Sequence, residues 1–595
     1  MGIVDISRII RMVSGCKDFI LLWLVIFIIY NINLRVISAG DALPASLLPF
    51  SILEYHNLYF DQFGRYFQYL TPGTTPYMFL ENDGHYLSVY PIVLPVLITP
   101  LYVISYILMN LLNYPIDMFN PGFYAIVTCM EKLSASIIAS SSAAFVYLFV
   151  RGLTGRKIAL VTTSIYAFAT NTWMISSQGL WQHGLAELLL SAMIYIVLLN
   201  ERTATKKNVL YLGLLSGLYL FNRPTDVFLI VPIFIYVAQL GKKNVVLYLL
   251  SSVVSGAPFL AYNVHYFGSI VGGYMKDASH FDFSQIIFFN FMGLLISPNR
   301  GLLVYTPIYV LSIFGILQAM GMFNPRIKKF ILISGICILM QILFYSVFSI
   351  WWAGWSYGPR FLTDSLPFMT LSLGIFMHNF SGYPVVGSKK KLWTLVIAVL
   401  LIWSLSVQVI GAFCFNYQWD ADQGPGKDPD RYWNFTDTQI GRAIHSGPVN
   451  VNPMATLSTI FALSKDIIYN PSDQSIKIYL NEDSGWYHLE DWEGVPTRWI
   501  SNDASLQVHS IGVHEVTLRL KALSFRNPRT LEIYANGDRS ARALVPSGFA
   551  NIHCNIILKD GSNFIRFHVV EDCDMEGQSK KNRCLSIAFQ DITMK

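Results

Sequence analysis

The chain has 595 residues, of which 53% are hydrophobic and 13% are charged. A soluble globular protein carries about 25% charged residues, so this composition excludes that class and indicates a multi-pass membrane protein. The net charge of +5 is concentrated in short segments between apolar runs, which argues against nucleic-acid binding.

Apolar runs of membrane-spanning length alternate with short basic segments. We predict about eleven spans by the length rule, near residues 18–37, 131–150, 158–175, 184–200, 208–221, 226–240, 245–263, 301–320, 330–349, 362–379 and 392–413. The basic segments are RGLTGRK, ERTATKK, GKK, RIKK and SKKK. Because basic loops remain in the cytoplasm, we expect the N-terminus inside and everything after residue 414 outside. VISAG after the first run also fits signal-peptide cleavage, but the run exceeds the usual apolar core of about 7 to 15 residues, so we treat it as an anchor.

One apolar stretch, residues 89–112, does not fit this alternation. A single crossing there would move every later basic loop outside. The stretch therefore either re-enters the membrane or is paired with a second crossing within residues 115–130. Three prolines interrupt its first half, and broken helices at membrane depth are typical where protein or an aqueous cavity covers them. Both alternatives leave residues 38–90 as a long first outer loop.

The first outer loop contains a candidate catalytic base, Asp41, directly after the first span. A carboxylate at the membrane interface can accept a proton from the hydroxyl group of one substrate while the lipid part of a second substrate remains in the membrane. The alternative is helix capping, since Asp41 precedes ALPASLLPF and Pro44 falls in its first turn. The two roles are compatible, so both remain open.

Three arginines lie where apolar runs meet the predicted outer face: Arg223 in FNRPTD, Arg300 in SPNRG and Arg360 in YGPRFLTD. Basic residues of membrane proteins are usually kept on the cytoplasmic side, so positive charges on the outer face are unexpected. The planar guanidinium of arginine is suited to bidentate binding of a phosphate. We therefore predict that Arg300 and Arg360 bind a phosphate, with Arg223 and Lys276 as further candidates. The alternative is a local ion pair between an arginine and the aspartate that ends FNRPTD or GPRFLTD.

Aromatic, amide and imidazole groups near the same face are candidates for binding a sugar or an acceptor: Trp181, Gln182, His183, Trp355, Tyr357 and His85. An interfacial tryptophan belt gives the same composition, and we favour the belt for Trp351 and Trp352. His183 is also placed to pair with Glu187 at a helix end.

We expect no metal and no other cofactor, with a divalent ion kept as an alternative. The outer histidines show no HExxH or HxH spacing, and Asp420 with Asp422 forms only a short DxD pattern. Arginine alone can stabilise a phosphate leaving group. The chain also lacks GxxxxGK[ST] and a GxGxxG after a strand, so a nucleotide-driven mechanism has no support.

Six segments carry a family resemblance: GDALPASLLPFSIL, GHYLSVYPIVLPVLITPLY, NTWMISSQGLWQH, FNRPTD, SPNRGLLVYTP and WWAGWSYGPRFLTDSLPF. Together, over about residues 15–415, they resemble the GT-C superfamily, among prokaryotic relatives of protein mannosyltransferases and aminoarabinose transferases. The resemblance implies a polyprenyl-phosphate sugar donor, an extracytoplasmic glycan, lipid or protein acceptor, inverting transfer of a hexosyl or pentosyl group, and a base role for Asp41. It also implies residence in the plasma (inner) membrane of a prokaryote.

After residue 414 the composition changes, and we divide the chain into a membrane domain (1–414), a linker or outer segment (415–470) and a β-sandwich (471–595). The alternating patterns SIKIYL, VTLRLKAL, TLEIYANG, NIILKD and FIRFHVV predict short strands. They suit a sandwich of about 120 residues outside the membrane. Its opening, GWYHLEDWEGVPTRWIS, is similar to sandwich domains that accompany some sugar-modifying membrane proteins.

Within this sandwich, Trp486, Trp492 and Trp499 are candidates for a sugar-binding face, with burial in the core as the alternative. In an oxidising compartment we expect a disulfide between Cys573 and Cys584, which leaves Cys554 as a buried thiol.

The sequence thus predicts an α-helical polytopic membrane protein of about 11 to 13 spans with an extracytoplasmic β-sandwich. The predicted function is transfer of a sugar from a polyprenyl-phosphate donor to an extracytoplasmic acceptor. A polymerase or ligase of lipid-linked glycans is an alternative, because it would use similar arginines. A flippase or transporter is a further alternative. It would need paired gates and repeat symmetry, and the long first outer loop and the terminal sandwich argue against it.

Overall fold

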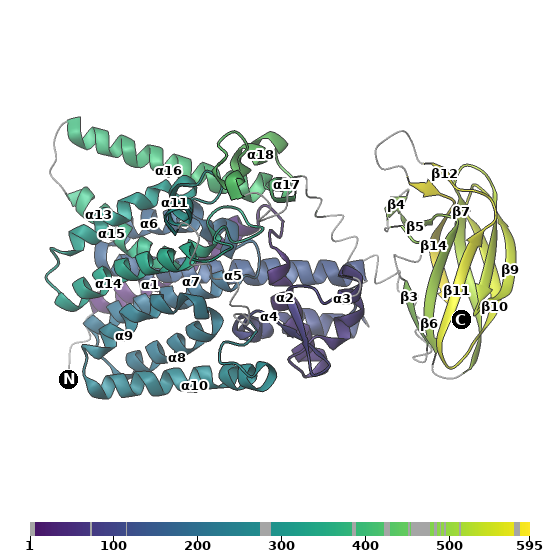
Figure 1. Ribbon diagram of the computed structural model, residues 1–595, viewed down its shortest axis with the longest axis horizontal. Coiled ribbons are helices and arrows are strands. Elements are labelled where there is room, and N and C mark those ends of the chain that lie inside the picture. Colours follow the sequence, from purple (N-terminus) through teal and green to yellow (C-terminus); the bar gives the residue numbers. More distant parts are fainter. Residues whose placement is uncertain are drawn as a thin grey trace. The chain divides into compact units, whose positions relative to one another are not determined.

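The computed structural model divides the chain into two compact units, residues 1–106 with 127–451 and residues 107–126 with 452–595. It describes residues 6–594 except 72–73, 113, 115, 119, 274–286, 383–387, 422–428, 450, 452, 454–475, 481–484, 488–489, 493–494, 511–512 and 576–582. The first unit is helical and the second is built mainly of strands (Figure 1). The predicted fold class, a polytopic helical membrane protein with a C-terminal β-sandwich, is confirmed.

The helices, in chain order, are α1 (Ile6–Asn31), α2 (Leu43–Phe50), α3 (Gly64–Leu70), α4 (Val93–Leu111), α5 (Pro121–Thr154), α6 (Arg156–Phe168), α7 (Gln182–Arg202), α8 (Lys206–Asn222), α9 (Val231–Ala238), α10 (Lys242–Phe267), α11 (Ile287–Ile296), α12 (Leu302–Tyr305), α13 (Val310–Ala319), α14 (Pro325–Ser346), α15 (Leu366–Gly382), α16 (Ser388–Cys414), α17 (Gln418–Ala421) and α18 (Gln439–Ser446). Among the described residues, α4, α5, α7, α10, α14 and α16 are long and apolar enough to cross a membrane.

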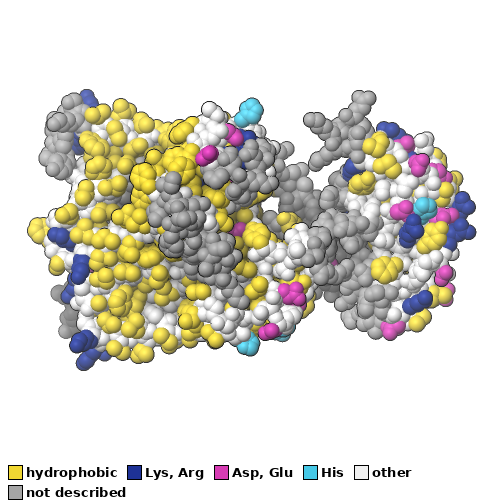
Figure 2. All heavy atoms as spheres, in the orientation of Figure 1, with side chains coloured by type: hydrophobic (Ala, Val, Ile, Leu, Met, Phe, Trp, Pro, Cys, Tyr) yellow, Lys and Arg dark blue, Asp and Glu magenta, His cyan; other side chains and the backbone are white. Residues whose placement is uncertain are grey.

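Charged side chains tie the basic turns of the helical unit together. Asp18 in α1 accepts hydrogen bonds from Arg151 (3.3 Å) and Arg156 (2.9 Å), so the first half of α1 and the RGLTGRK turn lie at the same end. Glu201 and Arg326, 3.4 Å apart, join the end of α7 to the start of α14. Figure 2 shows lysines and arginines of this unit gathered along one end of a broad apolar flank. The predicted alternation of apolar spans and basic turns accounts for this arrangement.

The predicted first outer loop folds into short elements that lead back toward α1. It contains the 3₁₀ turns η1 (Gly40–Ala42) and η3 (Asp61–Phe63), the π-turn η2 (Ser51–Tyr55), and a hairpin of β1 (Phe79–Asn82) and β2 (His85–Ser88). The apolar stretch with three prolines forms α4, which packs on this loop. The rings of Tyr102 and Phe50 lie 5.2 Å apart, and the Tyr106 hydroxyl donates to Glu54 at 2.8 Å.

Two predicted spans differ from the structure at points with a local cause, and one helix was not predicted. The first helix ends at Asn31, whose side chain donates to the carbonyl of Phe27, rather than at residue 37. The run 301–320 is broken between α12 and α13, because Pro307 lacks the N–H that a continuous helix needs. The prediction also missed α11, an apolar helix that is too short for the length rule.

The second unit contains two five-stranded antiparallel sheets (Figure 1). The strand orders are β10-β7-β14-β5-β4 and β3-β6-β11-β8-β9. The strands are β3 (Ile476–Leu480), β4 (Glu490–Trp492), β5 (Val495–Ile500), β6 (Asp503–Ser510), β7 (His514–Ser524), β8 (Arg529–Ala535), β9 (Asp538–Val545), β10 (Ala550–Leu558), β11 (Gly561–Val569) and β14 (Ile587–Met594). Alternate side chains of both sheets form one apolar core, as in a β-sandwich. Each strand predicted from an alternating pattern is present.

Trp486 and Trp499 are both buried, with 4% and 0% of the residue exposed. Trp486 lies in the core of the sandwich and packs against the rings of Phe567 and Phe589. Trp499 belongs to a separate apolar cluster with Leu523, Leu585 and Ala588. The prediction of a sugar-binding face is therefore wrong for these two tryptophans, because both rings are covered. The side chain of Trp492 lies outside the described part of the chain.

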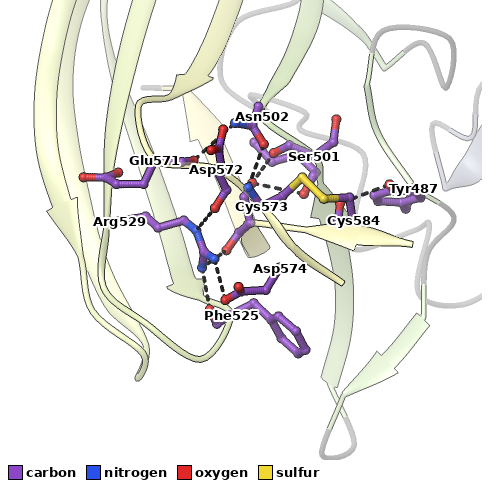
Figure 3. The surroundings of a disulfide bond; sticks show 12 residues. Tyr487, Ser501, Asn502, Phe525, Arg529, Glu571, Asp572, Cys573, Asp574 and Cys584 are labelled. Atoms are coloured by element: carbon purple, nitrogen blue, oxygen red, sulfur yellow. Dashed lines mark hydrogen bonds and ion pairs between the residues drawn. A yellow bond between two sulfur atoms is a disulfide. The ribbon is translucent and has the colours of Figure 1, made fainter. Parts of the chain in front are cut away.

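A disulfide joins Cys573 and Cys584, as predicted, and Cys554 is a buried free thiol (Figure 3). Arg529 holds the chain on both sides of Cys573 by donating to the carbonyl of Asp572 at 3.1 Å and to the carboxylate of Asp574 at 2.7 Å. The bridge and this arginine together fix the small strands β12 (Asp574–Met575) and β13 (Cys584–Leu585).

Candidate active site

The predicted base, Asp41, lies in η1 and is 9% exposed. The following helix, α2, begins with Ala42 as its N-cap and has no side-chain capping hydrogen bond there. The capping alternative is therefore wrong, because the Asp41 carboxylate does not turn toward the start of α2. Its two oxygens accept hydrogen bonds from residues far away in the sequence.

Asp41 is held between an arginine and a tyrosine. Arg360 donates from Nη1 to Oδ2 at 2.6 Å, and the Tyr77 hydroxyl donates to Oδ1 at 3.0 Å. Tyr77 precedes β1, so the first loop folds back over the start of α2. Gly40 permits this approach, since a Cβ there would lie 2.7 Å from the Tyr77 hydroxyl and 2.6 Å from Cε of Met78.

Two opposed effects set the ionisation of Asp41. Burial favours the neutral acid, but the charge of Arg360 and the hydrogen bonds from Arg360 and Tyr77 outweigh it and hold the pKa of Asp41 below its ordinary value. Asp41 is therefore a carboxylate at neutral pH, as a proton acceptor must be.

Arg360 begins the 3₁₀ turn η8 (Arg360–Ser365), directly after Pro359. Its Cζ lies 5.2 Å from the ring centre of Trp181 and 5.9 Å from that of Phe361, within range of cation–π attraction. The Trp181 side chain is 2% exposed, and its Nε1 has no hydrogen-bond partner among the described residues. The structure thus unites three of the predicted residues, Asp41, Arg360 and Trp181.

Arg223 belongs to a buried cluster of charges. Its Nε lies 3.0 Å from Asp226 and 3.3 Å from Asp364, and its Nη2 donates to the Tyr345 hydroxyl at 2.8 Å. Nδ1 of His183 lies 3.0 Å from the same Asp364. The ion-pairing alternative therefore describes Arg223.

Two pairings inferred from sequence spacing are corrected by this cluster. Asp364 pairs with Arg223 and His183, not with Arg360 four residues before it. His183 pairs with this aspartate, and the carboxylate of Glu187 instead accepts from the Thr172 hydroxyl at 2.7 Å. Sequence spacing could not show these contacts, because the tertiary fold brings together His183 in α7, Arg223 after α8 and Asp364 in η8.

Arg300 is 1% exposed and bonds mainly to backbone oxygens. It donates to the carbonyls of Trp352 (2.8 Å), Asn299 (3.0 Å) and Gly354 (3.0 Å) and to the carboxylate of Asp420 (2.9 Å). Four of the five N–H donors of an arginine are thereby directed at protein atoms. These contacts join two segments of the chain, and the predicted phosphate contact of Arg300 remains untested.

The remaining predicted residues take different places. Trp355 is 38% exposed, whereas Gln182 and Tyr357 are buried. The Tyr357 hydroxyl donates to the carbonyl of Val407 at 3.1 Å. His85 pairs with Asp61 at 2.7 Å and stacks on a tyrosine of its own loop. Lys276 lies outside the described residues, as does the second aspartate of the DxD pattern.

Two buried charged residues, Glu131 and Lys132, were not among the predicted site residues. Glu131, in α5, accepts from the hydroxyl of Ser46 at 3.0 Å and from the backbone N–H of Leu180 at 3.2 Å. Lys132 donates to the side-chain carbonyl of Gln178 at 2.6 Å. Adjacent buried charges at the start of an apolar run are a recognisable signal. Tyr77, in contrast, has no such signal, because tyrosines are common in exposed loops.

Within the described ranges, no group of three or more histidine, cysteine, aspartate or glutamate side chains is arranged to hold a metal ion. Asp420, the described half of the DxD pattern, is 2% exposed and bonds to Arg300 and to Gln439 Nε2 at 2.9 Å. The expectation that the protein needs no metal remains a prediction.

No protein-family model matches the sequence, and no curated protein matches it. Among solved structures, the chain is similar to ArnT from Cupriavidus metallidurans bound to undecaprenyl phosphate, with 11% identity over 76% of this chain and 71% of that one and a TM-score of 0.44. It is also similar to the Archaeoglobus fulgidus oligosaccharyltransferase tethered with an acceptor peptide, with 12% identity, coverages of 73% and 60% and a TM-score of 0.40.

A third similarity is to the GH26-CBM35 β-(1,4)-mannanase of Podospora anserina, with 15% identity and a TM-score of 0.15. This match spans 21% of the present chain and 28% of the mannanase.

Proposed function

We propose that the protein is a membrane glycosyltransferase that moves one sugar from a polyprenyl-phosphate donor to a hydroxyl of an extracytoplasmic acceptor. The observation that carries the proposal is the contact between Asp41 and Arg360 at 2.6 Å. It supports the proposal because a carboxylate, which can accept a proton, and a guanidinium, which can bind phosphate, lie together beside Trp181, directly before α7, a helix of membrane-spanning length.

The roles follow from the charges. The guanidinium of Arg360 binds the donor phosphate, because a planar group with five N–H donors can hold a phosphate and a carboxylate together. Asp41 accepts the proton of the acceptor hydroxyl as the acceptor oxygen forms a bond to the anomeric carbon. The bond between that carbon and the phosphate oxygen breaks, and its electron pair leaves with the polyprenyl phosphate. Arg360 stabilises the charge that develops there.

Tyr77 and Trp181 complete the site. Tyr77 orients the carboxylate of Asp41 through its hydroxyl, although the rest of its side chain is 64% exposed. Trp181 lies against Arg360 and brings a buried indole N–H to the same place. An aromatic surface and one donor are the usual means by which proteins hold a sugar ring and one of its hydroxyls.

The test is transfer of labelled sugar from synthetic undecaprenyl-phosphate hexoses and pentoses to a membrane extract, followed by analysis of the product. We expect a new glycosidic bond with the wild-type protein and a loss of at least 100-fold in kcat for Asp41→Asn, the scale of a general base. Full activity of Asp41→Asn would remove the base assignment. Movement of the lipid across vesicles without a new bond would indicate a flippase, and long products a polymerase.

A further inference from the structure

We propose that Trp355 and Tyr417 form the surface on which the donor sugar stacks, and that Arg300 is a positioning residue for this surface. The inference rests on the proposed function, since it takes Arg360 as the group that binds the donor phosphate. It adds Tyr417, a residue without a predicted role, and it replaces the phosphate role predicted for Arg300.

The two aromatic rings lie side by side near Asp41. Their centroids are 6.4 Å apart with an interplanar angle of 30°, and Trp355 is 38% exposed. The Tyr417 hydroxyl donates to the carbonyl of Ser38 at 2.9 Å, three residues before Asp41. This bond fixes the tyrosine against the turn that carries the base. Flat, partly exposed aromatic rings suit the apolar C–H face of a sugar.

Trp355 directly follows Gly354, which lies close to Arg360. A Cβ built on Gly354 would lie 4.0 Å from Nη2 of Arg360. In the proposed donor the sugar is bonded directly to the phosphate, so a phosphate at Arg360 brings its sugar next to this loop. The sugar that is transferred, rather than a distant part of the acceptor, is therefore the ring that meets Trp355.

Both aromatic residues belong to segments with unusual backbone conformations. Ala353 and Tyr417 have φ angles of 63° and 61°, and Gly354 has 65°. For residues other than glycine this left-handed region costs about 1–3 kcal/mol, so the surroundings must hold the backbone there. Such strain is found where the chain must present a side chain in one particular place.

Arg300 supplies contacts that hold both segments. It donates to the carbonyls of Trp352 and Gly354, on either side of Ala353, at 2.8 and 3.0 Å. It also donates to Asp420, three residues after Tyr417, at 2.9 Å. One guanidinium therefore ties the loop of Trp355 to the turn of Tyr417. A lysine cannot reproduce this, because its single nitrogen lacks the planar fork of donors.

The experiment compares two probes, undecaprenyl phosphate and the synthetic undecaprenyl-phosphate sugar that the wild-type protein uses best. Binding of each is measured from the ligand-dependent shift of thermal unfolding in detergent. In Trp355→Ala and Tyr417→Ala we expect affinity for the sugar-bearing probe to fall by about 3- to 10-fold, the range of an aromatic contact. Affinity for undecaprenyl phosphate should remain unchanged, and Trp355→Phe should recover most of the loss.

Arg300→Lys should reproduce this sugar-dependent loss, and it should add little when combined with Trp355→Ala, because both changes disturb the same surface. Trp403→Ala is the matched control. Trp403 is an exposed tryptophan on α16 whose indole donates to the carbonyl of Val304, and its removal should leave both affinities unchanged. Should Arg300→Lys fail to fold, the variants of Trp355 still decide the proposal.

Two outcomes overturn this inference. One is equal loss of both probes in the Trp355, Tyr417 and Arg300 variants, which would indicate a phosphate contact or a general loss of structure. The other is unchanged affinity for both probes in these variants while Arg360→Ala loses affinity for both. That result would contradict the stacking surface but would leave the proposed function standing. If Arg360→Ala binds both probes as the wild type does, the proposed function itself fails.

Discussion

Arg360 and Asp41 lie 319 residues apart in the sequence and 2.6 Å apart in the structure. The cation holds the pKa of the Asp41 carboxyl below its ordinary value, against the effect of burial. A phosphate that shares the same guanidinium weakens this hold, so the pKa of Asp41 rises as the donor binds. Under the proposed function, donor binding and the base strength of Asp41 would therefore be coupled through Arg360, and we expect the donor to bind before the acceptor is deprotonated.

The Asp41–Arg360 pair gives stability a defined dependence on pH. Because the pKa of Asp41 in the folded protein lies below the value of about 3.9 for an unfolded chain, its stabilising contribution is fully present above that value and is lost as the pH falls through the folded value. In detergent, the difference between the unfolding temperatures of wild type and Asp41→Asn should therefore stay constant from pH 7 to about 5. The difference should disappear in stronger acid, and a difference that grew toward low pH would contradict the assignment.

Tyr77→Phe removes the hydroxyl that orients Asp41 and leaves the ring in place. We expect kcat to fall about 5-fold, which corresponds to the roughly 1 kcal/mol of a partly exposed hydrogen bond. The loss of this donor should also raise the pKa of Asp41, so the acidic limb of the kcat–pH profile should move to higher pH. Tyr86→Phe, in β2 of the same loop, is the control. An unchanged profile in Tyr77→Phe would show that the contact has no part in catalysis.

Arg223→Leu should reduce stability and leave the chemistry of the donor site intact. The arginine neutralises Asp226 and Asp364, both fully buried. An apolar replacement leaves these two carboxylates without the positive charge of the guanidinium. Removing one partner of a buried pair costs about 3–5 kcal/mol. The measurement is the yield and unfolding temperature in detergent, with affinity for undecaprenyl phosphate determined on the folded fraction. A stable Arg223→Leu protein that bound undecaprenyl phosphate poorly would instead restore the phosphate role of Arg223.

Cys573→Ser opens the disulfide of the sandwich. A loop of this size contributes about 2–4 kcal/mol, and the bridge lies beside the bonds that Arg529 makes to Asp572 and Asp574. We expect the full-length variant to be cleaved by protease near residues 570–585 at lower temperature than wild type. Cys554→Ser, which changes a thiol outside the bridge, is the control. Equal resistance of Cys573→Ser and wild type would show that the hydrogen bonds alone hold this edge.

The sequence indicated Asp41 and Arg360 as candidates for one site because position and residue type agree, and the two side chains are in contact. An acid directly after a span and an arginine on the expected outer side are both unusual, since a charge next to the apolar core of a bilayer is costly unless it is used. The same reasoning could not separate Arg360 from Arg300, since both are arginines next to glycine or proline. Their roles differ through their partners, Asp41 for one and the carbonyls of Trp352 and Gly354 for the other. These partners are brought close by the tertiary fold.

The period of the hydrophobic pattern and the length of the apolar runs predicted the elements of the fold well wherever the pattern was long. The strands of the sandwich alternate clearly, and the spans are long apolar runs with basic ends. The pattern failed for α11, which is short, and for the break at Pro307, which a count of apolar residues ignores. It also left open whether Trp486 and Trp499 lie on a surface or are buried, because an alternating pattern does not say which face of a strand is covered; both are buried.

The pairing of Arg360 with Asp41 has a consequence for biogenesis. Asp41 leaves the ribosome 319 residues before its partner, so most of the polypeptide must be inserted before the carboxylate meets its guanidinium. Arg223 and Asp226, three residues apart, can neutralise each other as soon as their turn is made. A nascent chain therefore forms the contact between Arg223 and Asp226 early, whereas Asp41 meets its guanidinium only after residue 360 has been synthesised. We expect a chain that terminates before residue 360 to lack the contact between Asp41 and Arg360 altogether.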